Sequence, residues 1–126
     1  MQPLELELTA DPSQAKRLRN ELHHWLLQGG INSSTGHDII LATVEAFANA
    51  VKHPVARATA CIHIHGELQP DAVTLQIEDD GHWRQPDRTR DTGGFGLALM
   101  KSFMTDVHIE HSRDRTRVVL HRLLSR

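Results

Sequence analysis

The chain has 126 residues, 39% of them hydrophobic, and a formal net charge of −2 at pH 7. Its 14 basic and 16 acidic residues create no strong field that would attract nucleic acid or an anionic membrane, and a single cysteine, Cys61, excludes a disulfide framework. No apolar run approaches the roughly 20 residues of a membrane span, and the first residues lack the basic and apolar regions of a secretory signal. These features predict one cytoplasmic domain over residues 1–126.

The first part of the chain predicts a strand and then a helix. Leucine and glutamate alternate strictly over residues 4–8, which is typical of a strand with its leucines on one face. Asp11 caps a helix whose apolar residues recur at helical spacing and which ends at Gly29. Trp25 belongs to that apolar pattern, so we interpret it as part of the core.

A long helix is predicted over residues 34–53, opened by the capping residues Ser33-Ser34-Thr35 and stopped by Pro54. Spacings of three and four predict a core-facing stripe of Ile40, Val44, Phe47, Ala48 and Val51.

Glu45 and Asn49 lie four residues apart on this helix and therefore share one face, which Lys52 and His53 continue. A carboxylate and a carboxamide in register could hold a hydrated Mg²⁺ and a base near a phosphate. Considered alone, the pair is more simply explained as a solvated glutamate beside a tolerated asparagine.

After Pro54 the hydrophobic period changes to two, which predicts strands over about residues 59–65 and 73–79 with a turn between them. Period two places Asp79 on the same side as the buried Val73, Leu75 and Ile77. A carboxylate at the end of a buried face needs a partner, because its burial would otherwise destabilise the fold.

Residues 80–92 predict a polar loop, and the glycine cluster at residues 93–96 leads from it into an apolar helix. Backbone N–H groups at such a helix start could meet an anion, although a hinge before a core helix would have the same sequence. Neither a complete dinucleotide fingerprint nor a Walker A motif is present. Two closing strands are predicted over about residues 106–111 and 116–123.

The ten histidines invite a metal hypothesis. His63 and His65 could share a strand face, but no inward carboxylate or cysteine supplies an evident third ligand, so a zinc site is not predicted. Nucleophilic catalysis is not predicted either, because no Gly-x-Ser-x-Gly elbow occurs and Cys61 lies in mid-strand.

Three elements, in this order, resemble the N, G1 and G2 boxes of the histidine-kinase-like ATPase superfamily, which has the Bergerat fold. They are Glu45-Ala-x-x-Asn49-Ala-x-x-His53, Asp79 with Gly81, and Gly94-x-Gly96-Leu97. The first of them is similar to the helix signature of the anti-sigma-factor serine kinases of bacterial partner-switching systems. Asp106-Val107 and Thr116-x-Val118 also fit, so the resemblance spans nearly the whole chain.

The resemblance implies an α+β fold: a two-layer α/β sandwich with a mixed, mainly antiparallel sheet and about three helices on one face. It implies ATP and Mg²⁺ as cofactors, with Glu45 orienting or deprotonating an attacking hydroxyl and Asn49 giving Mg²⁺ an oxygen ligand. The residues that it assigns to ATP binding are Asn49, Lys52, His53, Asp79, Gly81, Gly94, Phe95, Gly96, Leu97 and Thr116.

The function implied is that of an ATP-dependent serine/threonine protein kinase that phosphorylates a small anti-sigma-factor antagonist and binds a sigma factor or another regulator. The alternative is a nucleotide-gated binding module that sequesters the regulator without phosphoryl transfer, and a scaffold that binds no nucleotide is a third. Trp83 and Arg115 depart from the pattern, since many relatives have glycine at both places. A homodimer stays open, and neither nucleic acid nor a membrane is an expected partner.

Overall fold

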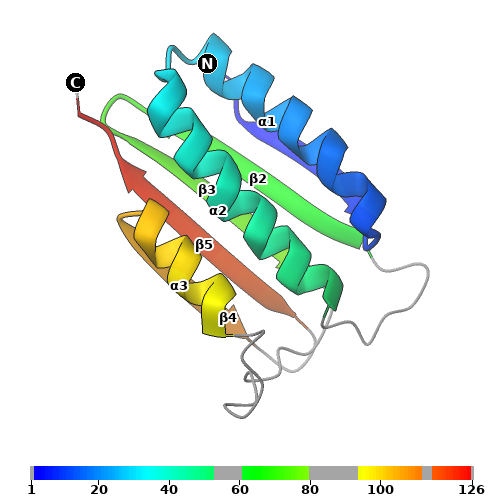
Figure 1. Cartoon of the computed structure of the whole chain (residues 1–126). Coiled ribbons are helices and arrows are strands. Elements are labelled where there is room, and N and C mark those ends of the chain that lie inside the picture. The colour runs from blue at the N-terminus through cyan, green and yellow to red at the C-terminus, as the bar shows by residue number, and fades with distance from the viewer. Residues whose placement is uncertain (1, 53–60, 80–93, 112–114, 126) are drawn as a thin grey trace.

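A computed structural model of the chain describes residues 2–52, 61–79, 94–111 and 115–125. These residues form two layers, a five-stranded sheet and three helices that pack on one of its faces (Figure 1). The strands are β1 (Leu4–Thr9), β2 (Cys61–Gln69), β3 (Ala72–Asp79), β4 (Asp106–His111) and β5 (Thr116–Leu123). The helices are α1 (Ala15–Gln28), which follows the short 3₁₀ turn η1 (Pro12–Gln14), α2 (Ser33–Lys52) and α3 (Gly94–Phe103). The expected α+β sandwich is confirmed.

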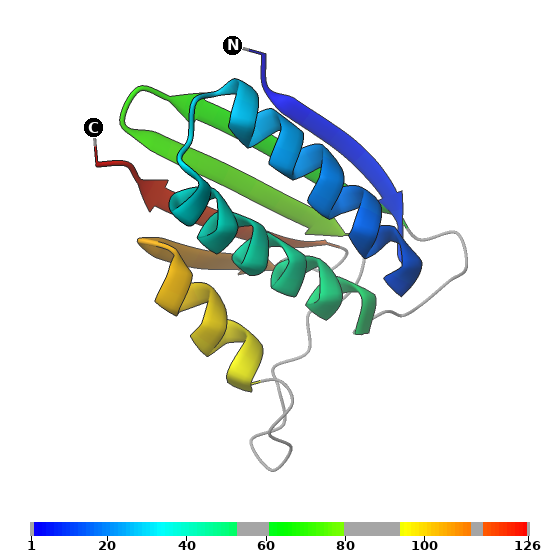
Figure 2. The same ribbon diagram turned by 45° about the horizontal axis from the view of Figure 1, so that its top comes forward.

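The sheet has the strand order β1-β2-β3-β5-β4, and each of the four described pairings is antiparallel. β1 and β4 are therefore the two edge strands. β3 lies in the centre, between β2 and β5, and its last residue, Asp79, is the register partner of Thr116, the first residue of β5. α2 lies between α1 and α3 over the middle of the sheet, as the turned view shows (Figure 2).

The core lies between the sheet and the helices, because each strand directs alternate side chains to that side. In β1 the three leucines are buried while Glu5 and Glu7 are exposed, as the strict alternation predicts. β3 likewise buries Val73, Leu75 and Ile77. None of the described helices is long and apolar enough to cross a membrane.

The buried face of α2 differs from the predicted stripe. Phe47 is buried as expected, but Ile40, Val44, Ala48 and Val51 are only half-buried. The residues buried beside Phe47 are Ile39, Ala42, Thr43 and Ala46. The pattern misled because a polar residue lies in the middle of the true stripe. The Thr43 hydroxyl donates to the carbonyl of Ile39 at 2.7 Å, which satisfies it inside the core.

The start of α2 also corrects the prediction, because the cap is Asn32. The side-chain oxygen of Asn32 accepts a hydrogen bond from the Thr35 backbone N–H at 2.8 Å. Its backbone carbonyl accepts one from the Gly36 backbone N–H at 2.9 Å. Ser33 and Thr35 are the first residues of the helix, one and three positions after this cap.

Trp25 of α1 packs on the sheet where β2 has a glycine. A Cβ at Gly66 would lie 3.1 Å from Trp25 Cη2, 3.1 Å from Leu75 Cδ1 and 3.2 Å from Leu4 Cβ. The missing side chain thus leaves the space in which the indole ring sits. The Trp25 Nε1–H donates to the carbonyl of Gln2 at 3.0 Å and ties the residues before β1 to α1.

Candidate functional site

α2 carries Glu45 and Asn49 in its second half, one turn apart and therefore on the same face. Both residues are half-buried. They are less exposed than the charged residues of α1, which all lie on the surface. Lys52 is the last residue of the helix, and His53 lies outside the described residues.

Asp79 and Thr116 form the second part of the site, at the end of β3 and the start of β5. They are register partners across the two strands. Thr116 is only 4% exposed and Asp79 is half-buried. Each of them already has an interaction partner within the structure. The half-buried Asp79 carboxylate therefore has the partner that the alternation of β3 led us to expect, and its burial does not by itself require a nucleotide.

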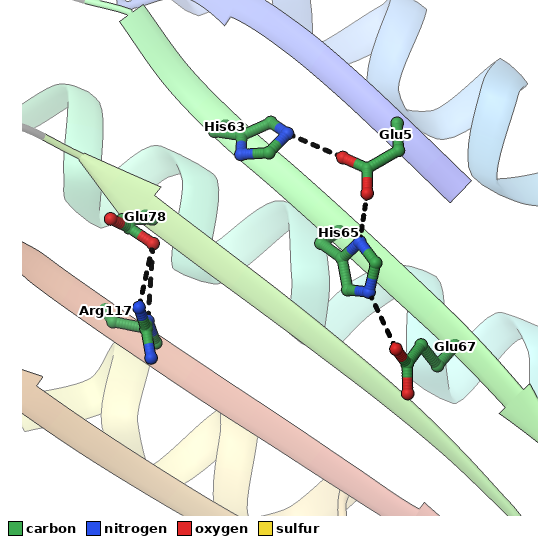
Figure 3. Close-up of polar contacts among 6 residues, drawn as sticks. All are labelled: Glu5, His63, His65, Glu67, Glu78 and Arg117. Atoms are coloured by element: carbon green, nitrogen blue, oxygen red, sulfur yellow. Dashed lines mark hydrogen bonds and ion pairs between the residues drawn. The ribbon is translucent and has the colours of Figure 1, made fainter. Parts of the chain in front are cut away.

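The neighbouring register pair, Glu78 and Arg117, lies on the opposite face of the sheet, and Figure 3 shows the two side chains meeting. The Glu78 carboxylate accepts from Arg117 at 3.3 Å and from Arg115 Nη1 at 3.0 Å. Arg117 also reaches Glu110 of β4 at 3.5 Å. We call these four residues the arginine clamp. It spans β3, β5 and β4 directly beside Asp79 and Thr116 and supports their register.

The clamp gives Arg115 a structural role, although the sequence presented it only as a departure from the family pattern. Its side chain is 66% exposed and turns to Glu78. Sequence reasoning missed this group because the contact depends on how β3 pairs with β5. The only available signal was the placement of Glu78 on the polar side of its strand.

The first residues of α3 complete the arrangement. Gly94, Phe95 and Gly96 open the helix, and Leu97, which follows them, is half-buried and packs against the core. Figures 1 and 2 place the end of α2, the end of β3, the start of α3 and the start of β5 at the same end of the sandwich. Gly81 and Trp83 lie outside the described residues.

The chemistry of these groups fits a bound ATP with its magnesium ion. A carboxylate such as Asp79 can accept a hydrogen bond from the exocyclic amine of adenine. The carboxamide oxygen of Asn49 is a ligand of the type that Mg²⁺ prefers. Backbone N–H groups at the start of α3 are suited to phosphate oxygens, because the first N–H groups of a helix have no partner within it.

A second cluster of polar groups lies on the outer face of β1 and β2, where His63 is the register partner of Glu78 (Figure 3). One carboxylate, that of Glu5, contacts His63 Nε2 at 2.6 Å and also His65 Nδ1, while His65 Nε2 contacts Glu67 at 3.0 Å. We call these four residues the histidine cluster. Among the residues that the structure describes, no group of His, Cys, Asp and Glu could hold a metal ion.

The histidine cluster shifts the acid–base behaviour of two of its members. Hydrogen bonds to Glu67 and Glu5 raise the pKa of His65 above its usual 6.5. The hydrogen bond from His65, supported by His63, lowers the pKa of Glu5 below its usual 4.5. A hollow of about 280 Å³ beside the two histidines is lined by Gln76 and Glu78 as well.

Residues 8–122 match the model of the histidine kinase-like ATPase domain family. Because this match covers most of the chain, the protein belongs to that family, whose members are ATP-binding domains.

The solved structures that are similar to the chain include the following two. One is the crystal structure of the RsbU and RsbW domains of Rv1364c from Mycobacterium tuberculosis, with 27% identity and a TM-score of 0.79. The match covers 98% of this chain but only 33% of the other, so this chain spans about a third of that protein's length. The other is the Acinetobacter baumannii histidine kinase AdeS, with 12% identity and a TM-score of 0.58, over 100% of this chain and 70% of that one. The latter likeness supports the fold alone. The family resemblance seen in the sequence is confirmed.

Proposed function

We propose that residues 1–126 act as one ATPase domain that is an ATP-dependent serine/threonine protein kinase of a bacterial partner-switching pathway. Its substrate is a small anti-sigma-factor antagonist, and it also binds a sigma factor or another regulator that the antagonist competes for. The family and the similarity to a structure that contains an RsbW domain support this proposal. They support a kinase-like ATPase in general, and the choice of serine or threonine is our own inference.

The observation that carries the proposal is the position of Glu45. It is half-buried on α2, one turn before Asn49, in the half of the helix that ends beside β3, β5 and α3. A module that only binds nucleotide needs groups for adenine, phosphate and metal, but it has no use for a carboxylate such as Glu45 one turn before the metal ligand. A kinase uses such a carboxylate to orient the attacking hydroxyl and accept its proton.

ATP with Mg²⁺ would supply the phosphoryl group and neutralise part of its charge. Asp79 would hold the adenine, with Thr116 beside it, and Asn49 would provide an oxygen ligand to the metal. Glu45 would take the proton of the serine or threonine hydroxyl as the hydroxyl oxygen bonds to the γ-phosphorus of ATP, while the bond from that phosphorus to the bridging oxygen breaks and ADP leaves. Lys52, His53, Gly81 and the residues of the α3 start, Gly94, Phe95, Gly96 and Leu97, would contact the nucleotide.

The test is transfer of labelled phosphate from ATP to proteins in a lysate of the source organism. We expect a labelled small protein with the wild-type chain and no label with Glu45→Gln, a substitution that keeps the shape of the side chain but removes the base. ATP affinity measured by calorimetry should be unchanged in this variant. The phosphate should resist acid and be released by alkali, as phosphoserine and phosphothreonine esters behave and phosphohistidine does not.

Two results would contradict the proposal. Equal labelling by wild type and Glu45→Gln would show that Glu45 does not act as the base. A stable complex with a regulator that forms only with ATP, together with no labelled protein, would establish the nucleotide-gated binding module instead.

A further inference from the structure

β1 is an edge strand of the sheet, and no other described strand pairs with its outer side. It pairs with β2 along its whole length, from Leu4 to Thr9. In an antiparallel pair, alternate residues direct their N–H and C=O groups away from the partner strand. Within the described part of the chain, Leu4–Leu8 make no backbone hydrogen bond other than those of the β1–β2 ladder. Such a row of groups is a template for another strand.

A groove of about 700 Å³ runs beside this edge, between residues 2–6 and the side chains of Glu21, Trp25 and Gln28 on α1. Leu4, Leu6 and Trp25 line this groove, and their side chains are 7%, 8% and 6% exposed. An open backbone edge next to a groove with apolar side chains is the arrangement that strand addition uses. Main-chain hydrogen bonds give affinity, and side-chain pockets select every second residue.

The charges along β1 indicate what kind of strand fits. Glu5 and Glu7 lie on its outer face, and Glu21 lines the groove. Glu5 contacts the two histidines, but among the described residues no hydrogen bond or ion pair engages the side chains of Glu7 or Glu21. A strand paired with β1 places its own outer-face side chains opposite Glu5 and Glu7. Opposite charges attract there and like charges repel.

The same charges disfavour a second copy of this chain as the occupant. Antiparallel pairing of β1 with another β1 would set the outer-face glutamates of both copies against one another, since Glu5 and Glu7 are the ionisable residues of this strand. A strand with basic residues at these positions would instead be attracted to Glu5 and Glu7.

We propose that the β1 edge and its groove bind an extended segment of a partner protein in which apolar and basic residues alternate. The apolar side chains enter the groove over Leu4, Leu6 and Trp25, and the basic ones lie against Glu5 and Glu7. This surface is separate from the candidate ATP site, because α1 and β1 lie on the other side of α2 from α3 (Figure 2). The proposal therefore holds whether or not the chain is a kinase.

The test uses a capped peptide of about nine residues in which valine and lysine alternate, titrated into the full chain by calorimetry. We expect it to bind at least about tenfold more tightly than a valine–glutamate peptide and to slow amide exchange over Leu4–Thr9. The double substitution Glu5→Lys with Glu7→Lys should reverse the preference between the two peptides. Asp71→Lys, at the β2–β3 turn, is the control for a general charge effect and should leave the preference as it is.

A third peptide has the same sequence but carries N-methyl groups on alternate amides, so that it cannot pair with β1. Strand addition predicts that its binding is lost. Equal binding of this peptide, equal effects of Asp71→Lys and the double substitution, or no protection of β1 would each overturn the proposal. Sedimentation that shows a dimer, with β1 protected in the absence of peptide, would also overturn it, because a second copy would then occupy the edge.

Discussion

On the helix-covered face of the sheet, β1, β2 and β3 present leucine, isoleucine and valine side chains that are almost wholly buried. On the other face the same strands present the histidine cluster and, with β5 and β4, the arginine clamp, of which Figure 3 draws Glu78 and Arg117. Burial of apolar area dominates the stability on the first face, and exposed ion pairs contribute little on the second. The difference shows that the fold depends on one face, while the other is free to carry charges that serve register, recognition and pH response.

The largest effect should follow from Phe47→Ala, because this side chain of α2 is 1% exposed against the sheet. We expect the free energy of unfolding to fall by about 3–5 kcal/mol in urea denaturation, from lost burial and the cavity left behind. Leu41→Ala on the same helix is the control, since Leu41 is 40% exposed and should cost far less. Similar losses in both variants would contradict the assignment of the buried face of α2.

A smaller effect is expected where the helix layer meets the sheet most closely. Gly66→Ala would put a Cβ 3.1 Å from both Trp25 and Leu75, so we expect a loss of about 1–3 kcal/mol in unfolding free energy. The matched control is Gly36→Ala in α2, where the nearest side-chain atoms would be 3.9 Å away. That variant should gain stability, by up to about 1 kcal/mol, because alanine favours the helix. If both substitutions changed the unfolding free energy in the same direction, the packing of Trp25 would not depend on the missing side chain at Gly66.

The smallest effect distinguishes the two polar groups on the open face by pH. The raised pKa of His65 means that its contribution is complete below about pH 6.5 and is lost as the pH rises through its higher value in the folded protein. The lowered pKa of Glu5 means that its contribution is present above about pH 4.5 and is lost as the pH falls through its lower folded value. The histidine cluster therefore stabilises the pairing of β1 with β2 most between these limits. Glu5 is half-exposed, so solvent keeps the whole effect below about 1 kcal/mol.

Unfolding of wild type and His65→Gln in urea at about pH 5.5 and about pH 9 would measure this. The difference between the two proteins should be present at the lower pH and nearly vanish at the higher one. Arg117→Gln is the control in the arginine clamp, and its deficit should be the same at both values because a guanidinium stays protonated. A deficit of His65→Gln that does not change with pH would contradict the ion pairs of the histidine cluster.

Much of the fold could be predicted because alternation and helical spacing are local signals. The alternation of residues 4–8 predicts β1, and the closing strands begin and end where they were expected. The stripe on α2 was misplaced because Thr43 is polar in sequence but satisfied within its own helix. The alternation of β3 correctly predicted that Asp79 lies on the side of Val73, Leu75 and Ile77. The Asp79 carboxylate is half-buried there, whereas those three side chains are buried.

The remaining features depend on register, which no single strand reveals. Thr116 comes to lie beside Asp79 only because β5 pairs with β3 after the chain has passed through α3 and β4. The contacts of Glu5 with His63 and His65 join residues almost sixty positions apart in the same way. Family resemblance supplied Thr116 where the pattern could not, whereas the histidine cluster belongs to no motif and was found in the structure.

We propose that the end of α2, the end of β3 and the start of α3 form a site for ATP with Mg²⁺. Calorimetric titration of ATP into wild type, Asp79→Asn and Asp71→Asn tests it most directly, because both carboxylates belong to the β3 region and only Asp79 lies at that end. We expect Mg²⁺-dependent binding that Asp71→Asn retains and that Asp79→Asn weakens by at least about a hundredfold, with the fold intact by circular dichroism. Tight binding by Asp79→Asn, or no binding by the wild type, would contradict it.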